Sequence, residues 1–406
     1  MKSSLNKSTA GKRGDQVRSD CYLKLELKRS GGIKIEVISK VESMYGDSIK
    51  AQLTEMCKFF NINNAEIYIE DAGALPFTIA ARFELAVKKL LPELDKEFLL
   101  PMNPNNYTST TKDRLRRSRL YLPGNEPKFF INAGLHSPDG IILDLEDSVA
   151  PAEKDAARLL VRNALRSVDF YSAERMVRIN QIPMGLNDLK HIVPHFVNVI
   201  LIPKCESSEQ VVEVEQEVNR IKRLHKLSNE IYFMPILESA LGIIKAYEIA
   251  AASRHNCALA IGLEDYTADI GTQRTNEGRE SFFARSMLIN AARAAGIQAI
   301  DTVFSDIADM EGLRQSVLEA KALGFEGKGC IHPRQVKVVH DAFAPSADEI
   351  EKAKKIVLAF EEAERKGLGV VALGSKMIDP PVVKRAQKTI DLAILNNIIP
   401  KNWKAG

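Results

Sequence analysis

The sequence predicts an α/β protein in which a (β/α)8 TIM barrel follows a small α+β domain. Short apolar segments recur eight times in residues 114–406, and each is followed by an amphipathic stretch with helical periodicity. Their spacing averages about 30 residues, as βαβ units require. A stretch rich in Pro, Asn, Ser and Thr, residues 100–113, is typical of a linker and separates this region from residues 1–99.

Residues 1–99 combine strand and helix patterns. Two segments with alternating apolar residues flank Gly31 and Gly32, and this arrangement predicts a hairpin. Asp47 is a candidate cap for the first helix, and Pro92 discourages continuation of the second. The predicted strands cover residues 21–27, 33–38 and 65–70, and the predicted helices cover residues 47–60 and 76–91.

The eight segments after the linker are β-branched and apolar along their length rather than alternating. This pattern is typical of parallel strands buried on both faces of a sheet. Eight units favour a closed barrel, with six strands in an open doubly wound sheet as the alternative. The predicted strands cover residues 120–122, 140–143, 176–179, 199–202, 232–236, 258–261, 300–303 and 328–331.

Composition argues against several function classes. The chain has 56 basic and 53 acidic residues, and a net charge of +3 does not indicate a broad nucleic-acid-binding surface. The basic residues near the N-terminus are typical of a mobile, solvated tail. No apolar run approaches the ~20 residues of a membrane helix, and no signal peptide is evident. The five cysteines lack metal-ligand or redox spacing, so we expect reduced, mostly buried thiols in a cytoplasmic protein.

Polar residues follow almost every predicted strand of the barrel. The carboxyl ends of barrel strands form one rim, where active sites lie. A single polar residue there is more often a helix cap or a salt-bridge partner, but eight strand ends that converge favour a site. The residues are Asp144, Glu146, Asp147, Arg178, Asn180, Lys204, Glu206, Glu238, Glu264, Asp265, Asp269, Asp301 and His332.

Two of these carboxylates predict a magnesium site. Glu238 and Asp265 follow neighbouring strands, and two oxygen ligands completed by water and substrate suit Mg²⁺. The strand ends carry no His/Cys set for zinc. Arg178 offers a planar fork for a carboxylate, or alternatively a salt bridge to Glu146 or Asp147. A metal and an arginine together predict a 2-oxo or 2-hydroxy carboxylate as substrate.

Lys204 leaves a second enzymatic mechanism open. It follows a predicted strand where the Schiff-base lysine of a metal-free aldolase would lie. Signatures of other enzyme classes are missing from the sequence. No GxGxxG motif follows a strand, and there is neither a Walker A loop nor a GxSxG elbow.

The barrel region carries an ordered series of motifs. They are RSRLYLPGN (117–125), DGIILDLEDSVAP (139–151), VRIN (177–180), IPK (202–204), LESA (237–240), GLED (262–265), Asp301, GKGCIHP (327–333) and GSKMID (374–379). As a set they resemble the citrate lyase β-subunit family, within the HpcH/HpaI aldolase superfamily. The resemblance covers residues 114–395.

The first domain carries motifs of its own. The segments YGDSI (45–49) and DAGALP (71–76), followed by AAR (80–82), resemble the acyl carrier (γ) subunit of citrate lyase. The resemblance implies a covalent phosphoribosyl-dephospho-CoA arm on a serine, for which Ser19 is the nearest equivalent. Several extra residues separate Ser19 from Ala10-Gly11, and Arg18 can take its place in the alignment. The alternative is a docking or oligomerisation module.

The resemblance implies a Mg²⁺-dependent carbon–carbon lyase for a 3-hydroxy-3-carboxyacyl thioester, carried by CoA or by an acyl carrier. Mg²⁺ on Glu238 and Asp265 would hold the hydroxyl and carboxylate, and Arg178 would grip the carboxylate. The products would be an acetyl thioester and a 2-oxo acid such as oxaloacetate. Asp379 matches an acid/base that reaches a neighbouring subunit, which implies a homo-oligomer, with other citrate lyase-like subunits as possible partners.

Four further residues are site candidates. Glu146 and Asp147 follow the second strand and are catalytic candidates, whereas Arg117 and Lys328 are candidates for contacts to the thioester. The alternatives are a malyl-CoA, citramalyl-CoA or β-methylmalyl-CoA lyase, a free 2-oxo-acid aldolase, or a non-catalytic scaffold with a degenerate carrier domain. A carrier arm would serve the barrel of its own chain or a neighbour's, because a short linker raises the local concentration.

Overall fold

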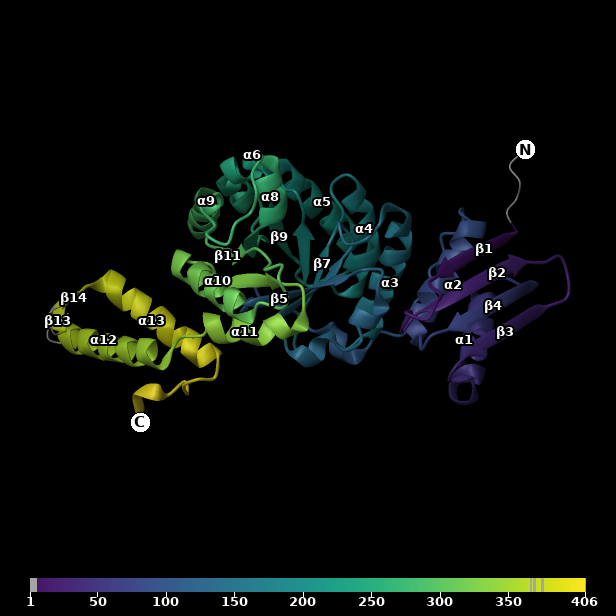
Figure 1. The fold of residues 1–406 in the computed structure, drawn as a ribbon, viewed down its shortest axis with the longest axis horizontal. Helices are drawn as coiled ribbons and strands as arrows, with labels where there is room; N and C mark the ends of the chain where they lie inside the picture. The colour runs from purple at the N-terminus through teal and green to yellow at the C-terminus, as the bar shows by residue number, and fades with distance from the viewer. Residues whose placement is uncertain (1–5, 366, 368–369, 374–375, 406) are drawn as a thin grey trace.

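The computed structural model describes residues 6–365, 367, 370–373 and 376–405, and it confirms the predicted fold class. Three parts follow one another along the long axis of the molecule in Figure 1. A small α+β domain lies at one end, a closed barrel of eight parallel strands in the middle, and a helical hairpin at the other end.

The N-terminal domain is a four-stranded sheet packed against two helices. Apolar and polar residues alternate along its strands, so that one face packs on the helices and the other is more exposed. The strand order is β1-β2-β4-β3. The elements are β1 (Lys7–Gly11), β2 (Cys21–Leu27), β3 (Ile33–Ser39), α1 (Glu42–Phe59), β4 (Ala65–Asp71) and α2 (Pro76–Leu90).

The predicted hairpin in this domain was wrong. β2 and β3 are not neighbours, because β4 lies between them, antiparallel to β2 and parallel to β3. Gly31 and Gly32 do adopt the positive φ of a tight turn. A turn reverses the chain but does not decide which strand pairs with β2. That neighbour is β4, which is remote in sequence.

Two other predictions for this domain also need correction. Helix α1 begins at Glu42 rather than at Asp47 and has no side-chain cap, since the Met44 and Tyr45 N–H groups already bond to the Val41 carbonyl. The basic N-terminal stretch is not all solvated tail, since Lys7–Gly11 pairs with β2 as an added strand.

The barrel contains all eight predicted strands, with ends within two residues of the prediction. β12 pairs with β5 and closes the sheet, which excludes the open-sheet alternative. The strands are β5 (Ser118–Pro123), β6 (Gly140–Asp144), β7 (Glu174–Arg178), β8 (Val199–Ile202), β9 (Tyr232–Leu237), β10 (Ala258–Ile261), β11 (Gln298–Asp301) and β12 (Gly327–Cys330).

Helices surround the barrel (Figure 1). They are α3 (Lys154–Ser167), α4 (Met184–Ile192), α5 (Ser208–His225), α6 (Ala240–Ile244), α7 (Ala246–Ala251), α8 (Leu263–Asp269), α9 (Phe282–Ala294), α10 (Met310–Leu323) and α11 (Pro333–Phe343). Strand residues alternate between the interior of the barrel and the layer beneath these helices. Ile142, Met176, Met234 and Ile300 belong to the interior cluster.

The predicted linker is not an open spacer. It contains a 3-10 turn, η1 (Pro104–Tyr107), and runs over the amino end of the barrel. The Asn106 amide donates to the Leu165 carbonyl at 2.9 Å, and the Thr108 carbonyl accepts from Arg175 at 2.9 Å. The segment therefore packs on the barrel and helps to fix the N-terminal domain relative to it.

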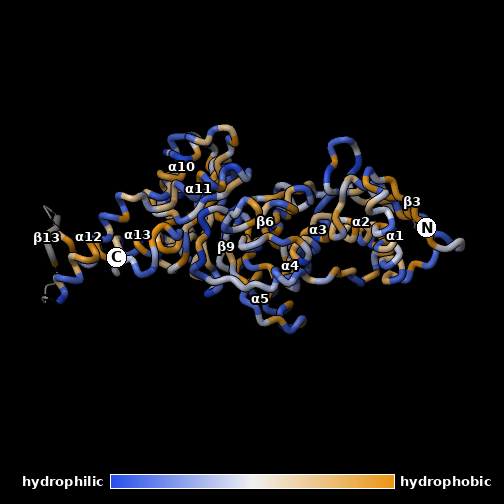
Figure 2. Tube along the Cα trace, turned by 90° about the horizontal axis from the view of Figure 1, so that it is seen from below, coloured by the Kyte–Doolittle hydropathy of each residue, from blue (hydrophilic) through white to orange (hydrophobic). Residues whose placement is uncertain are grey.

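A buried ion pair joins the first domain to the barrel. Arg162 of α3 donates to both carboxylate oxygens of Glu84 of α2, at 2.9 and 2.7 Å, and both side chains are fully buried. Asn163 adds a bond to the Phe77 carbonyl. Figure 2 shows α2 beside α3, with hydrophobic residues between the two domains. This contact makes the two domains one packed unit.

The C-terminal part is a helical hairpin with its own small core. Ile356, Phe360 and Ile390 belong to this separate buried cluster. The hairpin points away from the barrel in Figure 1. Its elements are α12 (Ala347–Arg365), β13 (Val371–Leu373), β14 (Lys376–Ile378) and α13 (Pro380–Leu395).

Two expectations from composition can be compared with the fold. All five cysteines are buried and free, as predicted. Within the described residues, the helices lack the length and apolarity needed to cross a membrane.

Candidate active site at the carboxyl rim of the barrel

A pocket of about 310 Å³ opens at the carboxyl ends of the barrel strands. It brings together three predicted site residues that are remote in sequence: Arg178 at the end of β7, Glu238 after β9, and Asp265 in the first turn of α8. Tyr121, Arg119 and Asp144 also line it. The predicted convergence of strand ends on one rim is therefore present in the fold.

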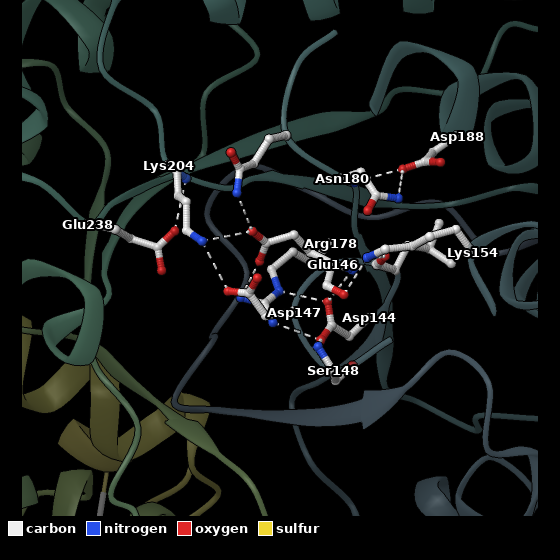
Figure 3. Close-up of polar contacts among 12 residues, drawn as sticks. Asp144, Glu146, Asp147, Ser148, Lys154, Arg178, Asn180, Asp188, Lys204 and Glu238 are labelled. Carbon is white, nitrogen blue, oxygen red and sulfur yellow. Dashed lines mark hydrogen bonds and ion pairs between the residues drawn. The ribbon is translucent and has the colours of Figure 1, made fainter. Parts of the chain in front are cut away.

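Asp144 holds Arg178 in place. Its carboxylate accepts two bonds from Arg178, from Nε and Nη2, each 2.7 Å long (Figure 3). Burial opposes ionisation of Asp144, but these charged bonds outweigh it and keep the pKa of Asp144 below its usual value. Arg178 Nη1 also lies 2.9 Å from Glu146 Oε2, an ion pair without good hydrogen-bond geometry. The two bonds to Asp144 use two of the five N–H groups of Arg178.

Glu238 lies buried at the mouth of the pocket. Its Oε2 accepts the Lys204 backbone N–H at 2.9 Å, and Lys204 has the positive φ of 46° that aims this group at the carboxylate. Gly262 makes room for it, because a Cβ there would lie 2.3 Å from Glu238 Oε1. Burial, more than any other cause, raises the pKa of Glu238 to about 7.

The Lys204 side chain lies among three carboxylates. Its Nζ is 3.4 Å from Glu146, 3.3 Å from Asp147 and 3.6 Å from Asp265. Burial lowers the pKa of Lys204, but these carboxylates outweigh that effect and raise it above the usual value. A lysine that stays protonated is a poor Schiff-base nucleophile. This geometry weighs against the metal-free aldolase mechanism.

We call these seven residues the rim cluster. Four carboxylates, Asp144, Glu146, Asp147 and Asp265, share the two cations Arg178 and Lys204, and the fifth, Glu238, accepts the Lys204 backbone N–H. Glu146 is almost fully buried, and burial raises its pKa. The cluster thus carries excess negative charge next to an open pocket. Among the residues that the structure describes, no three His, Cys, Asp or Glu side chains form a ready-made metal cage.

Two predicted thioester contacts lie away from this rim. Arg117 precedes β5 and lies at the amino end of the barrel, where Asp139 accepts its Nε and Nη2 at 2.8 Å each. Lys328 is buried on the outward face of β12, 2.6 Å from Asp301 in the layer beneath the helices. The structure does not bring either side chain to the pocket of its own chain.

Asp379 and Ser19 also lie outside the pocket. Asp379 caps α13 by accepting the Val382 N–H at 3.1 Å, next to β14 at the outer end of the hairpin (Figure 1). Ser19 lies in the loop between β1 and β2 with a positive φ of 57°. That loop meets the barrel through Lys12, which forms ion pairs with Glu126 and Glu153.

Sequence reasoning missed three residues of the pocket. Asp144 was placed at the rim but given no role, although it orients Arg178. Tyr121 and Arg119 were regarded as part of a strand motif. The available signal was Arg119 itself, a charged residue in a strand whose residues are mostly buried.

Residues 117–333 match the family model described as HpcH/HpaI aldolase/citrate lyase. The chain belongs to this family. Its barrel is 42% identical over 290 residues to citrate lyase subunit beta of Leuconostoc mesenteroides subsp. cremoris, covering 71% of this chain and 96% of that protein. Mitochondrial citramalyl-CoA lyase of Mus musculus is 31% identical over 317 residues, covering 75% of this chain and 94% of that protein.

A solved structure of an HpcH/HpaI relative matches the same region. It is protein CitE from Mycobacterium tuberculosis in complex with magnesium, acetoacetate and coenzyme A, with a TM-score of 0.59 and 31% identity. The match covers 70% of this chain and 99% of that one. Residues 11–90 match a second family model, described as malonate decarboxylase delta subunit (MdcD). The fusion of a carrier-like domain to this barrel, predicted from the motifs, is thereby confirmed.

Proposed function

We propose that this protein is a Mg²⁺-dependent lyase that cleaves a citryl-type 3-hydroxy-3-carboxyacyl thioester into a 2-oxo acid and an acetyl thioester. The observation that carries the proposal is the pocket that holds Glu238, Asp265 and Arg178 together. Relatives in the same family are named citrate lyase subunit beta, and the similar protein CitE was solved with magnesium, acetoacetate and coenzyme A.

The rim cluster fits a hard divalent cation. Glu238 and Asp265 would hold it, because both line the pocket and Glu238 Oε1 accepts no hydrogen bond from the described residues. Two protein carboxylates leave the other coordination positions to substrate oxygens and water, as Mg²⁺ prefers. When bound, the ion would act as a Lewis acid on the substrate carbonyl and hydroxyl oxygens.

Arg178 orients the substrate carboxylate in this proposal. Asp144 and Glu146 fix its guanidinium, and three of its five N–H groups make no hydrogen bond to the described residues. Because Asp144 is buried and the guanidinium is fixed, little side-chain entropy is lost when substrate binds.

The proton transfers fall to carboxylates in this proposal. Glu146 or Asp147, which lie behind the pocket lining against Arg178 and Lys204, would accept the hydroxyl proton, and the freed electron pair would form the carbonyl of the 2-oxo acid. The adjacent C–C bond breaks, and its electron pair passes to the thioester carbonyl oxygen as an enolate. A proton then returns to the enolate carbon, and Asp379 of a second copy is the proposed donor. This last role requires a homo-oligomer.

The carrier-like domain would present the thioester. Lys12 holds the β1–β2 loop next to Glu126 and Glu153, which follow β5 and β6 on the rim side. An arm on Ser19 would therefore start near the rim of the same chain or of a neighbour. The thioester is proposed on this phosphoribosyl-dephospho-CoA arm or on free CoA, and intact-protein mass spectrometry of native material tests for the arm.

A second substrate is favoured by a specific observation. The similarity to a citramalyl-CoA lyase extends over 75% of the chain, so a methyl-bearing thioester is the alternative. A non-catalytic scaffold is the non-enzymatic alternative. The first test is cleavage of citryl-, citramalyl- and malyl-CoA side by side, with and without Mg²⁺. No cleavage of any thioester would contradict the proposed function.

Glu238→Gln tests the metal site within that assay. We expect kcat/KM to fall by about 10²–10³-fold, since one charged ligand is lost while shape is kept. Glu206→Gln is the matched control, because Glu206 also follows a strand but does not line the pocket. Equal activity of wild type and Glu238→Gln would reject the metal site, even if the protein is a lyase.

A further inference from the structure

Arg119 lies at the inner end of the active-site pocket. It belongs to β5, lines the pocket and is 1% exposed. Its strand neighbours Leu120 and Leu122 belong to the outer core, whereas Tyr121 packs on the interior cluster, so Arg119 shares the inward face. This places a guanidinium in an apolar barrel interior beneath the rim cluster.

The donors of Arg119 are poorly used. Nη1 lies 3.2 Å from the Met234 sulfur, a weak acceptor, and Nη2 donates to the Asp301 backbone carbonyl at 3.3 Å. Nε is buried and has no hydrogen-bond partner. A buried arginine normally has its donors satisfied, because an unpaired buried charge is costly.

No carboxylate of the described residues forms an ion pair with Arg119. The nearest candidate on a neighbouring strand, Asp301, is engaged elsewhere. Its Oδ2 accepts from Lys328 at 2.6 Å and from Arg285 at 3.2 Å, both in the layer beneath the helices. Burial lowers the pKa of Arg119, as expected for a cation without a close counter-charge.

The pocket gives a ligand access to this guanidinium. Its lining continues from Glu238 and Arg178 at the rim, past Ala260 and Gly329, to Arg119. At Gly329 a Cβ would meet Val303 at 2.6 Å and Tyr121 at 3.3 Å, so a larger residue there would crowd this passage. The whole pocket has a volume of about 310 Å³, at the lower end of the range of ligand pockets.

We propose that Arg119 binds a second carboxylate of the substrate and makes the enzyme selective for a dicarboxylic 2-oxo acid. The inference rests on the proposed function and names the substrate class of the same pocket. One carboxylate of the 2-oxo acid portion lies at Arg178, and the distal one reaches the unpaired donors of Arg119. A substrate with a methyl group at that position leaves the guanidinium buried and unpaired, which is unfavourable.

The test compares two thioesters that differ at that position. Arg119→Met keeps an unbranched, flexible side chain and removes the guanidinium charge. We expect kcat/KM for citryl-CoA, with its distal carboxylate, to fall by about 10²–10³-fold. For citramalyl-CoA, with a methyl group there, we expect kcat/KM to stay within a few-fold of wild type or to rise. Equal changes for both substrates, or no change for either, would overturn the role of Arg119.

Arg285→Met is the matched control. It also removes a buried cation near Asp301, but Arg285 does not line the pocket. The ratio of kcat/KM for the two thioesters should stay at the wild-type value in this variant. A shift equal to that of Arg119→Met would overturn direct contact in favour of a general charge effect.

A binding measurement separates this inference from the proposed function. Calorimetry with Mg²⁺ compares oxaloacetate with pyruvate on wild type and on Arg119→Met. We expect wild type to prefer oxaloacetate and Arg119→Met to lose that preference. If no thioester is cleaved but the preference for oxaloacetate depends on Arg119, the lyase activity fails and the subsite stands. If thioesters are cleaved and the preference survives in Arg119→Met, the subsite fails alone.

Discussion

The two ends of the barrel use the same residue types in opposite ways. At the amino end, Arg116 and Glu174 are both fully buried and pair one to one, with bonds of 2.7 and 2.8 Å. At the carboxyl rim, four carboxylates share Arg178 and Lys204, and a fifth, Glu238, lies with them beside an open pocket. Matched pairing is typical of a structural network, whereas an excess of one sign next to a pocket is typical of a binding site.

The contrast is sharpest between two arginines. Arg116 and Arg178 each donate two bonds to one carboxylate. Arg116 also donates to the Thr111 and Lys112 carbonyls and to the Gln298 side chain, so all its N–H groups are used. Arg178 keeps N–H groups free at the pocket. The contacts around an arginine, rather than its residue type, distinguish the structural role from the functional one.

The largest effect should come from the matched pair. Arg116→Met leaves Glu174 buried without its cation, and we expect the free energy of unfolding to fall by about 3–5 kcal/mol. The activity per folded molecule should stay at the wild-type value. Urea denaturation and kcat/KM measured in parallel check both parts. Arg116→Met with Glu174→Met is the control, because removing both charges should restore much of the stability. Lost activity at unchanged stability would contradict the structural assignment.

A smaller free-energy effect, on activity rather than stability, is expected at the rim. Arg178→Lys keeps a charge beside Asp144 but loses the planar fork, and we expect kcat/KM to fall by about 10²–10³-fold. The midpoint of urea denaturation should move less than in Arg116→Met. Arg117→Lys makes the same change at the amino end, where Asp139 holds the side chain, and should leave kcat/KM unchanged. A loss of activity in Arg117→Lys would restore its predicted contact to the thioester.

The sequence predicts much of this fold because the strands are uniformly apolar and evenly spaced. That regularity identified all eight barrel strands and placed Glu238, Asp265 and Arg178 at one rim. It did not give the direction of every side chain. Lys328 belongs to a recognised motif yet faces outward from β12, and Arg117 lies just before β5 and hence at the opposite end. Side chains in a strand alternate between two faces, and a motif does not state which face a given position takes.

Pairing that is remote in sequence was harder to predict. The Gly31-Gly32 turn indicated a hairpin, but β4 inserts between the two strands. The same limit applies to the interface between the domains. In the sequence, Arg162 and Glu84 are ordinary helix residues. Only the fold shows that they form a buried ion pair with each other.

The smallest predicted effect is a pH dependence of opposite sign at the two ends. Burial raises the pKa of Glu238 to about 7, from about 4.3 in an unfolded chain. Its contribution to stability is full below pH ~4 and is lost as the pH rises through 7. His195 precedes β8 at the amino end of the barrel, where burial and Arg166 lower its pKa to about 3, from about 6.5 when unfolded. Its contribution is full above pH ~6.5 and is lost as the pH falls towards 3.

Between pH 5.0 and 6.5, without Mg²⁺, the two contributions therefore oppose each other in wild type. We expect Glu238→Gln to make the unfolding free energy rise more steeply with pH, by at most about 1.4 kcal/mol per pH unit, and His195→Gln to make it fall. Urea denaturation across this range measures both slopes. Saturating Mg²⁺ should remove the difference in pH slope between wild type and Glu238→Gln, because Glu238 stays ionised when it binds the metal. If the unfolding free energy of the two variants changed equally with pH in the absence of Mg²⁺, the predicted contrast between the two ends of the barrel would be wrong.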